Sequence, residues 1–118
     1  MSSELSLDVL LRALKDPAGF RFQAFACVDG QMSGPEAEAL MAQVGPDTPL
    51  PPCYLEAGSA DMAAGIPLSS FEVVLRKARK NFAMNVSYDM PHDFIKFVQM
   101  DSAQEANRRM CEFLLKAV

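Results

Sequence analysis

The only histidine of the chain, His92, lies in the stretch SYDMPHDF at residues 87–94, between Pro91 and Asp93. Histidine is the side chain whose charge changes most readily near neutral pH, and a neighbouring carboxylate can orient its imidazole. These residue types could serve acid–base catalysis with a serine or cysteine nucleophile, or could bind a metal ion. Each of these sites needs partners from elsewhere in the chain.

A nucleophile for His92 finds little support in the sequence. The Gly-x-Ser-x-Gly pattern of many hydrolases is absent, because the nearest match, AGSADMAAG at 57–65, fails after Gly58-Ser59. Three cysteines are far apart in the sequence and lie in no local signature of cysteine catalysis; they are Cys27, Cys53 and Cys111. We therefore predict no catalytic residue and interpret the cysteines as small, buried apolar side chains.

Metal and cofactor sites find equally little support. One histidine with Asp89 and Asp93 on a single turn is a small ligand set, and the spacing does not match a calcium-binding loop. The sequence has no Cys-x-x-Cys pair and no glycine-rich phosphate-binding loop. We predict neither a metal nor a cofactor.

The residues on both sides of His92 alternate in hydrophobicity. Residues 82–88 place every second apolar side chain on one side, and residues 94–100 form a second short apolar run. Met90–Asp93, which lies between them, contains residue types that favour turns. This pattern predicts an antiparallel β-hairpin, 82–88 with 94–100, and an exposed His92 at its tip.

The remaining segments predict one more strand and about four amphipathic helices. Alternation over 20–28 indicates a strand, and apolar spacing with capping signals indicates helices at 6–16, 33–45, 69–82 and 101–118. The proline-rich segment 46–57 should be extended, with a candidate short strand at Cys53–Glu56. Together these elements predict a single α+β domain, 1–118. It would be a two-layer sandwich whose small antiparallel sheet packs on the helices.

Two of the predicted strands carry apolar residues on both faces, which points to an exposed apolar patch. Such patches mark interaction sites. The candidate residues on the outer sheet face are Phe25, Cys27, Phe94, Val98 and Met100. Arg76, Arg79 and Lys80 in the run RKARK could contact an acidic partner. The alternative is that residues 46–57 cover this face.

Charge and composition narrow the class of protein. Residues 1–68 contain nine acidic and three basic side chains, a net of −6, and residues 69–118 contain six and eight, a net of +2; the sum is −4. This balance makes nucleic acid an unlikely partner. No apolar run is long enough for a membrane span. The N-terminus has no signal-peptide pattern, and the odd, scattered cysteines suit a reducing compartment, so we predict a cytoplasmic protein.

The function predicted from these features is regulation through protein binding. The chain would inhibit or sequester another protein, as an anti-activator of a transcription factor or as an immunity-type inhibitor, and it could form a homodimer. Two alternatives stay open. One is a small enzyme or ligand-binding subunit with a pocket near His92. The other is a secretion chaperone or an oligomeric structural subunit.

Overall fold

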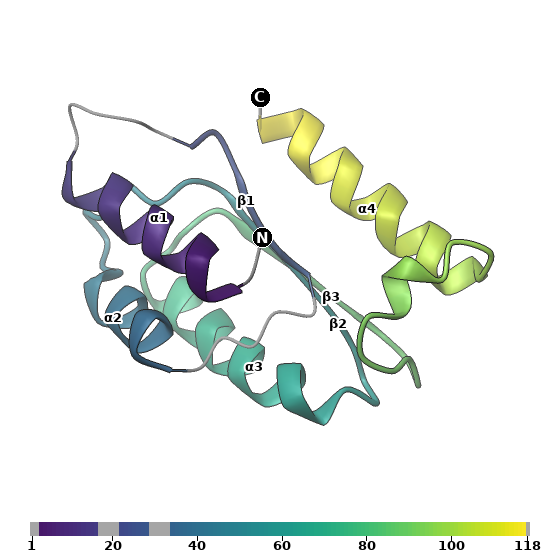
Figure 1. Ribbon diagram of the computed structural model, residues 1–118. Coiled ribbons are helices and arrows are strands. Elements are labelled where there is room, and N and C mark those ends of the chain that lie inside the picture. The colour runs from purple at the N-terminus through teal and green to yellow at the C-terminus, as the bar shows by residue number, and fades with distance from the viewer. Residues whose placement is uncertain (1–2, 17–21, 29–33, 118) are drawn as a thin grey trace.

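The fold is a small parallel sheet between two layers of helices (Figure 1). The computed structural model describes residues 3–16, 22–28 and 34–117. In chain order the elements are α1 (Ser3–Lys15), β1 (Phe25–Val28), α2 (Pro35–Gln43), β2 (Cys53–Gly58), α3 (Met62–Lys77), β3 (Phe82–Ser87), the 3₁₀ helix η1 (Phe94–Lys96) and α4 (Asp101–Ala117).

The sheet has the order β1-β2-β3, and both strand pairs are parallel. Cys53 of β2 is in register with Phe25 of β1 on one side and with Phe82 of β3 on the other. The predicted antiparallel sheet is therefore wrong. Between neighbouring strands the chain returns to the end of the sheet from which it started, as parallel pairing requires. The connection from β1 to β2 contains α2, and the connection from β2 to β3 contains α3.

The central strand, β2, lies in the proline-rich segment, and it confirms and extends the candidate short strand predicted at Cys53–Glu56. All six of its residues are buried, so β2 lacks the polar–apolar alternation of a strand that has one face in solvent. Residues 53–57 therefore form the middle of the sheet and do not cover one of its faces. Only residues 46–52 remain as the connection from α2.

The predicted strand 94–100 is also wrong. Phe94 begins η1 and is completely buried, whereas Phe97 and Val98 are 54% and 66% exposed in the turns that lead to α4. The two apolar faces of this segment reflect a helical turn followed by a loop. The strand predicted at 82–88 is confirmed as β3, whereas the strand predicted at 20–28 contains β1 only at its end, with residues 20–21 outside the described part.

Helices cover both faces of the sheet. In Figure 1, α1, α2 and α3 lie on one side and α4 lies on the other. The main core joins the first three helices to the sheet through buried residues that include Leu10, Leu40, Leu55, Phe71 and Leu75. A smaller core holds η1 against α4 through Phe94, Ala103 and Ala106.

The predicted helices are present, but the one predicted at 69–82 is shifted toward the N-terminus and ends five residues earlier, at Lys77. α1, α2 and α4 match the predicted segments closely, and Pro35 occupies the start of α2 after Gly34. α3 begins at Met62, seven residues before the capping signal at Ser69. Gly65 and Pro67 lie within this extension, and both are poor residues in a helix interior, which is why the sequence did not predict it.

Among the described residues, we find no helix that combines the length and the apolar character needed to cross a membrane.

Candidate active site

The parallel sheet brings His92 next to Asp61. Asp61 follows the end of β2, and His92 follows the end of β3, so both lie beyond the carboxyl edge of the sheet. The distance from Nδ1 of His92 to Oδ2 of Asp61 is 2.6 Å. The side chain of Asp61 is 2% exposed and that of His92 is 48% exposed. The pair thus joins a buried carboxylate to an imidazole that solvent or a substrate can reach.

The proton of this hydrogen bond can be assigned from the chemistry of its two groups. An ionised carboxylate only accepts hydrogen bonds, so Nδ1–H of His92 donates to Asp61. In the neutral imidazole this leaves Nε2 as the proton acceptor. The carboxylate also stabilises the positive charge that forms when Nε2 takes up a proton. The pair therefore has the geometry of a general base with its orienting acid.

A second carboxylate lies on the other side of the imidazole. Oδ1 of Asp93 is 3.5 Å from Nε2 of His92, and Oδ2 of Asp93 is 3.1 Å from Nζ of Lys96. The side chains of Asp93 and Lys96 are 41% and 74% exposed. This exposed pair lies at the nitrogen that would receive a proton, whereas Asp61 holds the opposite nitrogen.

Backbone hydrogen bonds join the two loops that carry the pair. Ser59 N–H donates to the carbonyl of Ser87 at 2.9 Å, and Ala60 N–H donates to the carbonyl of Met90 at 3.0 Å. Asp61 N–H donates to the carbonyl of Gly58 at 3.0 Å, which closes a tight turn after β2. The loop of Asp61 and the loop of His92 therefore form one connected unit at the edge of the sheet.

The structure corrects the predicted setting of His92. The residue does not lie at a hairpin tip, because η1 follows it where the second strand was predicted. The sequence analysis missed Asp61, although it lies in the stretch AGSADMAAG that was searched for a nucleophile. Asp61 and His92 could have been paired from the sequence only if β2 and β3 had been predicted as parallel neighbours, because the residues that follow such strands lie at the same edge of the sheet.

The apolar residues predicted to form an outer patch do not share one surface. Cys27 is buried and Phe25 packs against the main core, both on the side of α1–α3. Phe94 is buried in the small core. Val98 and Met100 are 66% and 38% exposed, and they lie in the turns before α4. The predicted apolar sheet face is wrong, because the sheet that would carry it is not formed.

The basic residues of the run RKARK have separate surroundings. Arg76 is exposed, pairs with Glu72 at 3.3 Å and lies over the ring of Phe82, 5.4 Å from its centre. Nζ of Lys80 donates to the carbonyls of Pro46 and Thr48 at 3.1 and 2.5 Å, so it fixes the connection before β2. Arg79 is exposed and has a left-handed backbone, φ 56°. Contact of this surface with an acidic partner stays a prediction.

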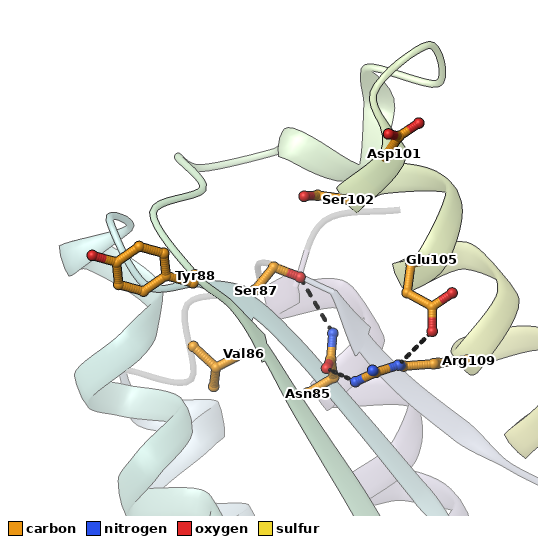
Figure 2. A pocket seen from close by; sticks show the side chains of 8 residues that line it. All are labelled: Asn85, Val86, Ser87, Tyr88, Asp101, Ser102, Glu105 and Arg109. Atoms are coloured by element: carbon orange, nitrogen blue, oxygen red, sulfur yellow. Dashed lines mark hydrogen bonds and ion pairs between the residues drawn. The ribbon is translucent and has the colours of Figure 1, made fainter.

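A polar pocket of about 560 Å³ lies between β3 and α4. Figure 2 shows the guanidinium of Arg109 between Glu105 of α4 and Asn85 of β3. The distance from Nε of Arg109 to Oε1 of Glu105 is 3.0 Å. Hydrogen bonds from Arg108 and Arg109 lower the pKa of Glu105 to about 2. Neither His92 nor Asp61 lines this pocket.

The same network continues into the protein to a completely buried carboxylate, that of Glu56 in β2. Nδ2 of Asn85 donates to its two oxygens at 2.7 and 3.0 Å, and the hydroxyl of Tyr54 donates to it at 2.9 Å. Burial, followed by the contact with Glu56, raises the pKa of Tyr54. These bonds satisfy a buried charge and attach α4 to the sheet, which gives the network a structural role.

Comparison with known proteins shows a likeness in fold. No protein-family model matches the chain, and neither does any curated protein. The crystal structure of esterase B from Lactobacillus rhamnosis (HN001) matches with a TM-score of 0.64 and 14% sequence identity. The match covers 84% of this chain and 42% of the esterase, so the chain spans less than half of that protein. At this identity the likeness concerns the fold alone.

Proposed function

We propose that the chain supplies the histidine base and its carboxylate to an active site that hydrolyses esters, of the Ser-His-Asp kind. The observation that carries the proposal is the 2.6 Å contact between His92 Nδ1 and a carboxylate oxygen of the buried Asp61. Its position beyond the carboxyl ends of parallel strands is where open α/β sheets place their active sites. The name of the structural neighbour, an esterase, agrees with this chemistry.

The reaction would use the two nitrogens of His92 in different roles. Nε2 removes the proton of a nucleophilic hydroxyl while its oxygen bonds to the ester carbonyl carbon. Asp61 stabilises the imidazolium through Nδ1–H. The ester C–O bond then breaks and Nε2 returns the proton to the departing alcohol. Water repeats the sequence on the acyl intermediate and releases the acid.

We expect the nucleophile to come from a segment outside the described residues. In hydrolases of the α/β class the order along the chain is serine, then the acid, then histidine, and here Asp61 precedes His92. More than half of esterase B also lies outside the match. β1 is an edge of the described sheet, so a further parallel strand could add there and bring its own loop to the same edge.

That the chain is a regulatory protein that binds another protein remains a prediction, and fewer of the residues proposed for its binding surface are exposed than the sequence suggested. It depended on an apolar sheet face, and of the residues proposed for that face only Val98 and Met100 are exposed apolar side chains. The contact between His92 and Asp61 supports an enzyme, which the sequence left open as a small enzyme or ligand-binding subunit with a pocket near His92. We therefore prefer the hydrolase.

Hydrolysis of p-nitrophenyl acetate tests the proposal, because this activated ester reacts even with an oriented imidazole. Even without the serine, Nε2 of His92 can react with this ester directly, so the wild-type chain should release p-nitrophenol at least about tenfold faster than the His92→Gln variant. Circular dichroism and the thermal unfolding midpoint serve as controls for folding. Equal rates for wild type and His92→Gln, with both folded, would contradict the proposal.

A further inference from the structure

The side chain of Ser59 connects the loop of Asp61 to the loop of His92. Its Oγ accepts a hydrogen bond from the backbone N–H of Asp89 at 2.5 Å. Ser59 precedes Asp61 by two residues and Asp89 precedes His92 by three. The hydroxyl of Ser59 therefore joins the start of the His92 loop to the Asp61 loop.

The backbone of Asp89 gives this hydrogen bond a specific task. Asp89 has φ 56°, in the left-handed region, which few residues other than glycine, asparagine and aspartate adopt. A backbone in that region persists when its surroundings hold it there. The Ser59 hydroxyl binds the N–H group of this same residue.

Gly58 allows the two loops to approach closely. A Cβ atom added at Gly58 would lie 2.0 Å from the carbonyl oxygen of Met90 and 2.5 Å from its carbonyl carbon. That carbonyl also accepts the hydrogen bond from Ala60 N–H. Met90, two residues before His92, is thus held against β2 by a contact that only glycine permits, and Ser59 holds the residue before it.

We propose that Ser59 is a positioning residue for the Asp61–His92 pair. The proposal rests on the proposed function only for its catalytic consequence. The 2.6 Å hydrogen bond between the pair depends on the relative placement of two separate loops. Besides the hydrogen bond between Asp61 and His92 itself, the Ser59 hydroxyl makes a side-chain hydrogen bond that joins those loops directly. Without it the histidine loop would leave its left-handed start, and Nδ1–H would lose its alignment with Asp61.

The test reads the imidazole directly by NMR. His92 is the only histidine, so ¹⁵N-labelled protein gives a single set of imidazole signals. In the wild type we expect one dominant tautomer, with Nδ1 protonated and hydrogen-bonded. Ser59→Val and Ser59→Thr form a matched pair, similar in shape, of which only threonine keeps the hydroxyl. Ser87→Ala removes a hydroxyl at the end of β3 that bonds Asn85 and not the histidine loop.

The positioning role is supported if Ser59→Val loses the signal of the hydrogen-bonded Nδ1–H and shows a mixture of tautomers. Ser59→Thr and Ser87→Ala should both keep the wild-type pattern. The proposal is overturned if Ser59→Val keeps the wild-type signals, or if Ser87→Ala changes them as much. Because Ser59 is exposed and Ser87 is only partly buried, we expect all three variants to fold, which circular dichroism checks.

Activity separates this proposal from the proposed function. Ester hydrolysis by Ser59→Val should lose about 10- to 100-fold in kcat, as expected for a catalytic group that is slightly misplaced, with KM little changed. If the wild type shows the bonded imidazole but hydrolyses no ester, the proposed function fails and the positioning role stands. If hydrolysis depends on His92 but Ser59→Val retains full kcat, the positioning role fails and the proposed function stands.

Discussion

The two members of the proposed catalytic pair, Asp61 and His92, differ in their access to solvent. Asp61 is almost completely buried, so its charge acts on the imidazole with little screening by water. His92 is about half exposed, so Nε2 can exchange a proton with a group that arrives from outside. A general base needs this division, since one nitrogen must be held and the other must remain accessible.

The reactivity of the three cysteine thiols reports whether the strands that carry two of them are buried. Burial, with a smaller contribution from Cys27, raises the pKa of the Cys53 thiol to about 12. Cys53 and Cys27 are buried, whereas Cys111 is exposed on α4. With Ellman's reagent at pH 8 we therefore expect one thiol to react rapidly. A Cys111→Ser variant should lose that fast reaction, and all three thiols of the wild type should react in guanidinium chloride. Rapid reaction of a second thiol in the folded protein would contradict the placement of β1 and β2.

At the scale of elements, η1 anchors the chain directly after His92. Phe94 is completely buried against Ala103 and Ala106 of α4, two residues beyond His92. The loop of His92 is therefore held from both ends, by β3 before it and by this small core after it. α4 serves the site by holding η1 in place.

Phe94→Ala should lower the free energy of unfolding by about 3–5 kcal/mol, the usual loss for a buried phenylalanine. Val98, which is 66% exposed four residues later, provides the control. Val98→Asp should change stability by less than about 0.5 kcal/mol, as surface substitutions usually do. Urea unfolding followed by circular dichroism measures both. Comparable losses for the two variants would mean that residues 94–100 pack as a strand after all.

The sequence predicted the amphipathic helices and β3 because their apolar residues recur with a clear period. β2 gave no such signal, because its two faces are both covered. Residues 94–100 gave a false one. Phe94 is buried in a 3₁₀ turn and Val98 is exposed in a loop, yet their spacing resembles that of a strand. The spacing of apolar residues shows where apolar side chains occur, but it does not show which part of the fold buries them.

At the scale of the whole molecule, the direction of the strands decides where the chemistry lies. An antiparallel hairpin places His92 at an isolated tip, whereas parallel β2 and β3 place the residues that follow each strand at one edge. His92 could be noticed from its type alone. Asp61 lies 31 residues earlier, and only the parallel topology identifies it as the partner. The fold prediction failed because the helices between the strands were not interpreted as parallel crossovers.

Substitution of each of the two carboxylates beside the imidazole of His92 distinguishes the role of Asp61 from that of Asp93. Asp61 is 2.6 Å from Nδ1 and Asp93 is 3.5 Å from Nε2. For reaction with p-nitrophenyl acetate, Asp61→Asn should reduce the rate by more than about tenfold, because the amide favours the tautomer in which Nε2 carries the proton and cannot act as base or nucleophile. Asp93→Asn should change it by less than about fivefold, since exposed charge pairs contribute less than about 1 kcal/mol. Equal effects of the two substitutions, or a larger effect of Asp93→Asn, would contradict the assignment of Asp61 and His92 as the catalytic pair.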